Sequence, residues 1–228
     1  MIRLLPLLFL SSVLAAQQWT PLLNGKNLDL WETHGPCHFT ILSDGSIVGQ
    51  RVHDDVSNPV GKWPLDSVEY RHWLNQQAWL YTKAEYGQFD LHLEYWIPNG
   101  ANSGVSIRDS SRAKYATYEA PVPAGLKDTT PAHIGYEIQI IDGEKEKYQT
   151  GSIYTFVAAP KGIQRVGEWN FLDIESRNDR IAVRLNATLV AEYPGEPGRP
   201  LSGPIGLQLH DQFTFAMFRN IRIREIMK

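Results

Sequence analysis

Hydrophobic and polar residues alternate with a period of two along most of this chain. A clear example is Phe89–Trp96, and the same alternation recurs in six other segments. Each segment predicts a β-strand with one face toward a hydrophobic core and the other face away from it. The six segments are 105–108, 136–140, 171–175, 181–185, 205–210 and 218–225.

Turn-forming residues separate the predicted strands, for example Pro98-Asn99-Gly100 and Gly203-Pro204. Few helical stretches lie between them, which argues against parallel βαβ units. The pattern predicts an all-β fold with almost no helix, a two-sheet antiparallel jelly-roll sandwich. Two long segments with little periodicity, 45–77 and 112–131, are expected to be loops at a functional rim.

The first sixteen residues have the features of a signal peptide. Arg3 precedes an apolar run, and small residues at Ala15-Ala16 provide a cleavage site. The run is too short to span a bilayer, which needs about 20 apolar residues. We therefore expect residues 17–228 to form a single exported domain, secreted or periplasmic, with no membrane span.

Composition narrows the functional classes further. Hydrophobic residues make up 43% of the chain and charged residues 21%, as in ordinary globular proteins. The net charge of −3 argues against a nucleic-acid partner, which usually needs a basic excess. Seven Trp residues are typical of a protein that handles sugars. Cys37 is the single cysteine, so stability must come from the core rather than from an internal disulfide.

Several polar residues alternate with the apolar ones in ways unusual for a solvated surface. Residues at this parity are expected to share one face of one sheet and to line a polar groove. They are Arg108, Glu137, Gln139, Gln208 and His210. His92, Glu94 and Trp96 have the same parity on their own strand, and the sequence does not assign that strand to a sheet.

Glu137, Gln139 and Asp142 lie at a spacing that resembles the E-x-D-x-x-E signature of laminarinase-type glycosidases. A β-bulge between 139 and 142 would turn Asp142 back toward Glu137. Two carboxylates on one face would suit a conventional retaining glycosidase, one attacking and the other donating a proton. This is one alternative for the function.

A wider resemblance covers nearly the whole chain, from about residue 19 to 226. LNGKNL (23–28) followed by Trp31, LYTKAEYGQFDL (80–91), NSGV (102–105) with Arg108, GYEIQIID (135–142) and GPIGLQ (203–208) with His210 occur in order. These motifs resemble the 3-keto-disaccharide hydrolase domain family, long catalogued as a domain of unknown function. The resemblance implies a concanavalin A-like lectin/glucanase jelly roll. The segment 52–77 is longer than the family pattern.

The resemblance implies a chemistry. In a 3-keto-glycoside the ketone acidifies the proton on C2, and its removal allows the aglycone to be eliminated from C1 before water adds. Glu137 and His210 are then the acid/base candidates, and Asp142 is a second acid or an orienting group. Arg108 would stabilise the enolate, or pair with Glu137, while Gln139, Asn102 and Gln208 would bind sugar hydroxyls.

The partners follow from the same resemblance. The substrate would be a small carbohydrate, and an enzyme that oxidises C3 of the sugar would act upstream. No cofactor is expected, although Glu137, Asp142 and His210 are donors that suit a divalent metal. A non-catalytic carbohydrate-binding module is a further alternative, because fold does not fix function.

Overall fold

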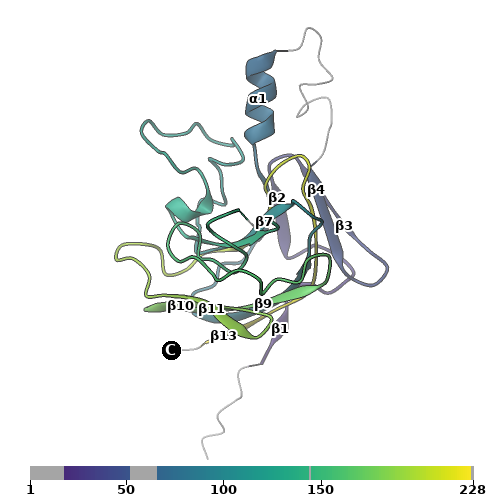
Figure 1. Ribbon diagram of the computed structural model, residues 1–228, viewed down its shortest axis with the longest axis vertical. Helices are drawn as coiled ribbons and strands as arrows, with labels where there is room; N and C mark the ends of the chain where they lie inside the picture. The colour runs from purple at the N-terminus through teal and green to yellow at the C-terminus, as the bar shows by residue number, and fades with distance from the viewer. Residues whose placement is uncertain (1–17, 52–65, 144, 227–228) are drawn as a thin grey trace, which may run out of the picture.

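The computed structural model describes residues 18–51, 66–143 and 145–226, and it shows two antiparallel sheets (Figure 1). One sheet has eight strands in the order β11-β10-β9-β6-β13-β4-β3, with β1 paired to β13. The other has five strands in the order β2-β5-β12-β7-β8. The strands are β1 (Thr20–Pro21), β2 (Trp31–His34), β3 (Cys37–Ile41), β4 (Ile47–Arg51), β5 (Ala78–Thr82), β6 (Phe89–Trp96), β7 (Asn102–Ile107), β8 (Tyr136–Ile141), β9 (Asn170–Arg177), β10 (Arg180–Leu185), β11 (Thr188–Tyr193), β12 (Ile205–Leu209) and β13 (Phe215–Glu225).

All seven predicted strands are present, and the predicted two-sheet antiparallel sandwich is confirmed. Strands without clean alternation escaped prediction. In β5 all five residues are buried, because one face packs into the core between the sheets and the other is covered by a loop. A strand buried on both faces has no polar period for the sequence to display.

The core lies between the two sheets and follows the alternation. Leu91 and Leu93 of β6 face Ile138 and Ile140 of β8 across the same apolar cluster, and all four are fully buried. The residues between them therefore point away from this core, on the outward faces of their two sheets. These outward faces carry the polar chemistry of the molecule.

One helix departs from the sequence prediction of a loop. Helix α1 (Ser67–Asn75) projects from the top of the body in Figure 1 and is followed directly by β5. Asp66 caps it by accepting hydrogen bonds from the backbone N–H groups of Val68 and Glu69. Only Trp73 of this helix is buried, so the apolar periodicity that normally reveals a helix is weak.

The predicted signal peptide, residues 1–16, lies outside the described residues, as does most of the unusual segment 52–77. In the described part of the chain, neither α1 nor the short 3-10 helix η2 (Pro131–His133) is long and apolar enough to cross a membrane.

Candidate active site

The register of the five-stranded sheet brings its polar residues together on the outward face. Glu137 lies opposite Ser106, which in turn lies opposite Gly206, and Gln208 lies opposite Trp79. Cross-strand partners share a face, so these residues form one surface. We call it the Glu137 face; it comprises Gln77, Trp79, Tyr81, Asn102, Ser106, Glu137, Gln139 and Gln208.

A chain of side-chain hydrogen bonds crosses the centre of this face. Gln208 donates from Nε2 to Glu137 Oε1 at 2.9 Å and to Gln77 Oε1 at 3.2 Å. The indole N–H of Trp79 donates to the same Gln77 oxygen at 3.1 Å. Three elements are thereby locked into one geometry: the segment before β5, the strand β12 and the strand β8.

Within the described residues, three buried polar atoms on this face have no hydrogen-bond partner. They are Glu137 Oε2, Gln208 Oε1 and Ser106 Oγ, from the three neighbouring strands β8, β12 and β7. Ser106 lies beside the Tyr81 hydroxyl, but no hydrogen bond of good geometry joins the two. Each unsatisfied buried group costs about 1–3 kcal/mol. Their convergence indicates a place where a ligand supplies the missing partners.

Glu137 is the chemically unusual member of the group. Its side chain is buried, and burial raises the pKa of its carboxyl to about 8, with further contributions from the negative charges of Asp128 and Asp109. The hydrogen bond from Gln208 opposes this shift but does not cancel it. Glu137 therefore holds a proton at neutral pH and can donate it, which is the state required of a general acid.

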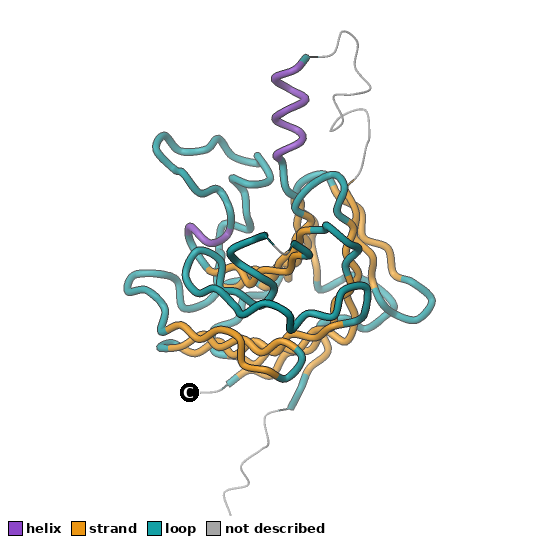
Figure 2. The backbone as a smooth tube through the Cα atoms, in the orientation of Figure 1, coloured by secondary structure: helices purple, strands orange, loops and turns teal. Residues whose placement is uncertain are grey.

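The loop of residues 109–131 covers part of the Glu137 face. Ala113 and Ala116 pack on the stacked rings of Trp79 and Tyr81. Arg112 Nε donates to Glu32 Oε1 at 2.7 Å, and a carboxylate oxygen of Glu119 lies 2.9 Å from His34 Nδ1. This covering loop, part of the teal loops in Figure 2, contains the predicted rim 112–131. Its Asp128 is a carboxylate near Glu137 that sequence reasoning missed.

Asn102 and Gln139 form a second polar pair on the same face. Gln139 donates from Nε2 to Asn102 Oδ1 at 3.1 Å, and Gln139 is only 6% exposed. Among the described residues, none accepts a hydrogen bond from the side-chain N–H groups of Asn102. The pair offers hydrogen-bond donors beside Glu137, as expected for residues that bind sugar hydroxyls.

His210 directly follows β12 and begins a loop that is held by hydrogen bonds. Its Nδ1 lies 3.4 Å from Asp211 Oδ2. Asp211 Oδ1 also accepts hydrogen bonds from the backbone N–H groups of Phe213 and Thr214. Thr214 Oγ1 in turn accepts from the Asn102 N–H at 3.3 Å, which ties this loop to the Glu137 face. Phe213 on the same loop is 83% exposed, and sequence reasoning did not single it out.

The expected position of Arg108 on this face is wrong. Arg108 has a φ of 59°, which turns its side chain toward the other sheet. There its Nε and Nη2 donate to Ser176 Oγ at 3.0 and 2.8 Å. Gly135 and Gly203 pack directly against the Arg108 backbone, where a Cβ on either would lie 2.6 Å or less from backbone atoms. This close packing fixes the turn that parity alone could not reveal.

The expected bulge that would bring Asp142 toward Glu137 is also wrong. The pairing of β7 with β8 is unbroken from Asn102–Ile141 to Ile107–Tyr136. Asp142 lies just beyond the strand and accepts a hydrogen bond from the Gly100 N–H at 2.8 Å, stabilising the turn before β7. Five residues of extended strand separate the Cα atoms of Glu137 and Asp142 by about 16 Å.

Residues that could bind a metal do not gather at the site. Within the described residues, no three His, Cys, Asp or Glu side chains lie close enough to hold an ion, including the set Glu137, Asp142 and His210. That the protein needs no cofactor stays a prediction. Cys37 is equally removed from the chemistry, because burial raises the pKa of its thiol to about 12.

Sequence reasoning also missed Gln77 and Trp79. Both lie just before or within the fully buried β5, where nothing alternates. The signal that could have found Gln77 is an amide adjoining an apolar run, but such residues are common. Its role depends on the register of β5 with β12, which is a tertiary property.

A match to a known domain family shows which family this chain belongs to. The model of the 3-keto-alpha-glucoside-1,2-lyase-like domain matches residues 18–224. The chain belongs to this family. Membership supports a function on carbohydrates and confirms the resemblance found in the sequence. A comparison with curated protein sequences gives no match.

Solved structures agree with the fold of this family. The chain is similar to two candidate glycosyl hydrolases from Parabacteroides distasonis. One is 20% identical with a TM-score of 0.62, covering 92% of this chain and 94% of that one. The other is 26% identical with a TM-score of 0.61, covering 92% and 100%. A carbohydrate-binding module, CBM66 from Bacillus subtilis, is 14% identical with a TM-score of 0.52, covering 86% and 96%, and shares the fold alone.

Proposed function

We propose that this protein cleaves the glycosidic bond of 3-keto-glycosides such as 3-keto-disaccharides, by abstraction of the C2 proton followed by elimination and hydration. The observation that carries the proposal is Glu137, a buried carboxyl that holds its proton at neutral pH and has an unpartnered oxygen on the Glu137 face. The family domain and the candidate glycosyl hydrolases of similar structure support a carbohydrate substrate.

Glu137 serves as the general acid in this proposal. Elimination pushes electrons onto the oxygen that leaves C1, and a proton delivered there stabilises the departing alcohol. A carboxyl with a pKa of about 8 keeps that proton at pH 7, whereas an ordinary glutamic acid would have lost it. The neighbouring Gln208 holds Oε1 at 2.9 Å and leaves Oε2 for the substrate.

His210 serves as the base that removes the C2 proton. Asp211 Oδ2 lies 3.4 Å from Nδ1, so a carboxylate stands beside the imidazole and would stabilise the positive charge that forms when the ring accepts a proton. The side chain is 42% exposed, so substrate can reach it from solvent.

The side-chain amides of the Glu137 face bind the substrate in this proposal. The side chains of Asn102 and Gln139 are hydrogen-bonded at 3.1 Å and lie on the two strands that carry Ser106 and Glu137. Their N–H groups are suited to bind the sugar hydroxyls and the oxygen at C3, on which negative charge develops in the enolate. Gln208 binds through its unpartnered Oε1, which accepts from a sugar hydroxyl.

Glu137 is 2% exposed, so substrate access requires a neighbouring segment to shift, and the covering loop on Trp79 and Tyr81 is the segment proposed to do so. Three residues near the contact with Trp79 and Tyr81 have positive φ without being glycine: Arg112 at 52°, Ala113 at 55° and Tyr118 at 57°. Such conformations cost about 1–3 kcal/mol each when they are strained. The strain lowers the free energy needed to lift this loop from the face.

The two-carboxylate alternative is disfavoured in its predicted form. Retaining glycosidases hold their carboxyl groups about 5–5.5 Å apart and inverting ones about 6.5–9.5 Å apart. Asp142 stabilises the Gly100 turn, and Glu137 points outward from the strand about 16 Å away along the chain. We therefore assign Asp142 no step in the reaction.

The test compares a 3-keto-disaccharide with the same disaccharide unoxidised at C3. We expect sugar release only from the 3-keto form, because a C3 alcohol leaves the C2 proton far too weakly acidic. During turnover in D₂O, deuterium should appear at C2 of the released keto-sugar beyond spontaneous exchange. Equal rates on the unoxidised substrate would refute the proposal, and tight binding without release would indicate a binding module instead.

The proposal also implies where the enzyme acts and which reaction supplies its substrate. An exported enzyme of this kind would act on substrate supplied by a reaction that oxidises C3 of the sugar. Mass measurement of the mature protein, with a start near Gln17 expected, tests the export; retention of Met1 in an exported fraction would contradict it.

A further inference from the structure

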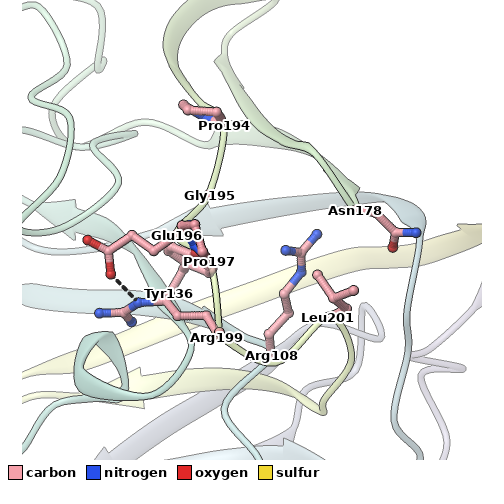
Figure 3. A pocket seen from close by; sticks show the side chains of 10 residues that line it. Arg108, Tyr136, Asn178, Pro194, Gly195, Glu196, Pro197, Arg199 and Leu201 are labelled. Carbon is pink, nitrogen blue, oxygen red and sulfur yellow. Dashed lines mark hydrogen bonds and ion pairs between the residues drawn. The ribbon is translucent and has the colours of Figure 1, made fainter.

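A cavity of about 520 Å³ lies beside Arg108, on the other side of strand β8 from Glu137. Its lining includes Arg108, Tyr136 and Asn178, together with residues of the Pro- and Gly-rich segment 194–201. Figure 3 shows the Arg108 side chain with the segment 194–199 on one side and Leu201 and Asn178 on the other. The proposed reaction uses none of these residues.

Among the described residues, Arg108 carries a buried charge without a carboxylate partner. The residue is 2% exposed, and its hydrogen bonds go to the neutral acceptors Ser176 Oγ and Arg177 O. The other arginine of the cavity, Arg199, is neutralised by Glu196 at 2.6 Å. A buried charge costs several kcal/mol unless it is compensated, so the cavity has one positive charge in excess.

The free hydrogen-bonding capacity of the cavity consists mainly of donors. In the described structure, Arg108 Nη1 has no acceptor, because Nε and Nη2 make all three of the hydrogen bonds of that side chain. The Tyr136 hydroxyl accepts from the Glu196 N–H at 2.9 Å, which leaves its own proton to donate. The side-chain amide of Asn178 is likewise unengaged among the described residues, since only its backbone N–H is bonded, to Gln88 Oε1.

The backbone conformation of Arg108 is fixed by its neighbours. Its left-handed backbone is held between Gly135 and Gly203, neither of which could carry a side chain there. A hydrogen bond that links the two sheets through Ser176 needs only a neutral donor, not a charged one. The Arg108 guanidinium also lies 5.9 Å from the centroid of the Tyr136 ring, a weak cation–π contact that supplies no counter-charge. The guanidinium faces a cavity whose other walls include Pro194, Pro197 and Leu201.

We propose that this cavity binds the carboxylate of a small organic acid, with Arg108, Tyr136 and Asn178 as donors. A carboxylate offers two acceptor oxygens and one negative charge, which match the surplus donors and the surplus charge. The apolar walls contact the body of the ligand. The cavity lies within the size range typical of small-molecule sites.

The test is a calorimetric titration of the full chain with sodium glucuronate, with glucose as the uncharged match and acetate as the minimal carboxylate. We expect saturable 1:1 binding of glucuronate that weakens as salt increases, competition by acetate, and no binding of glucose at this site. Asn178→Ala and Tyr136→Phe should each weaken binding about 3- to 10-fold, as loss of one hydrogen bond does. Asn99→Ala, an exposed asparagine in a distant turn, should leave it unchanged.

Two further variants separate this site from the proposed active site. Glu137→Gln should bind glucuronate as the wild type does, even where it has lost turnover. Arg108→Met should lose binding more than 10-fold, provided that its circular dichroism shows the native fold. Binding that is absent at 10 mM glucuronate, equal for glucose, or unaffected by both Asn178→Ala and Tyr136→Phe overturns the proposal.

Discussion

The outward faces of the two sheets come from the same alternating pattern, yet their polar groups are arranged in opposite ways. On the Glu137 face, buried amides surround a single carboxyl, and three polar atoms have no partner. On the outward face of the eight-stranded sheet, Asp90 accepts from both Arg177 and Arg224. We call this second surface the ion-pair face.

The pairing on the ion-pair face is extensive. Glu94 binds Arg219 at 2.6 Å and Asn220 at 2.9 Å, and His92 Nδ1 lies 2.7 Å from Asp173 Oδ1. Although partial burial opposes it, the hydrogen bonds from Asn220 and Arg219 hold the pKa of Glu94 below its usual value. Burial acts in the same direction on Glu137, but among the described residues no arginine offsets it there, and the pKa of Glu137 rises to about 8.

The two faces differ in how far their polar atoms have hydrogen-bond or ion-pair partners. This difference separates a functional face from a structural one. Both faces contain carboxyl groups, and both contain aromatic rings. A carboxylate whose lone pairs are taken by arginine cannot donate a proton or bind a sugar without losing those bonds. Glu137 keeps its proton and a free oxygen, at a cost in stability that a ligand can offset.

The largest expected effect is on turnover. Glu137→Gln keeps the size and the hydrogen bond with Gln208 but removes the transferable proton. We expect kcat on a 3-keto-disaccharide to fall about 10²- to 10⁴-fold with the fold intact. Glu94→Gln on the ion-pair face is the matched control and should keep kcat within a few-fold. Turnover of Glu137→Gln close to wild type would remove Glu137 from the mechanism.

The next effect is on stability and belongs to the ion-pair face. Asp90→Asn leaves Arg177 and Arg224 without their shared carboxylate, whose side chain is only 11% exposed. We expect a loss of about 1–3 kcal/mol in the free energy of unfolding, measured by urea denaturation.

Glu192→Gln is the comparison for that measurement. Glu192 reaches Arg180 at 3.4 Å, and both side chains are at least 42% exposed. Such surface pairs contribute about 0–1 kcal/mol. A smaller loss for Asp90→Asn than for Glu192→Gln would show that burial does not govern the strength of these pairs.

The third effect is a pH dependence of stability that originates in Glu137. Folded protein keeps this proton up to about pH 8, whereas the ordinary value for the unfolded chain is 4.5. Between these values the folded state binds more protons, so stability falls as pH rises, by at most about 1.4 kcal/mol per pH unit. Glu137→Gln removes this slope. Its advantage over wild type in urea unfolding should therefore grow from pH 5 to pH 8, and a constant difference would argue against a raised pKa.

The smallest effect concerns two exposed aromatic residues. Phe213, 83% exposed, lies on the loop of His210, whereas Phe215 on the ion-pair face packs against Trp96 with ring centroids 5.8 Å apart. If Phe213 stacks on a sugar ring, Phe213→Ala should raise KM about 2- to 10-fold with little change in kcat. Phe215→Ala should leave KM unchanged. Equal effects of the two substitutions would deny Phe213 a part in binding.

Much of the Glu137 face could be predicted from the sequence. Glu137, Gln139 and Gln208 alternate with core residues, and strand parity was enough to place them on one outward surface. The alternation of 89–96 was equally clear, but it could not say which sheet the strand joins. That is why His92 and Glu94 were candidates for the groove, although they lie on the ion-pair face.

The sequence by itself determined which side chains leave the core, because that depends only on the two-residue period of a strand. Three features depended on the tertiary structure. The register of β5, β12 and β8 brought Gln77, Gln208 and Glu137 into one hydrogen-bonded chain. The packing of Gly135 and Gly203 turned Arg108 away from that chain. The burial of Glu137 in the folded chain, which no local pattern encodes, is the largest cause of the rise in its pKa.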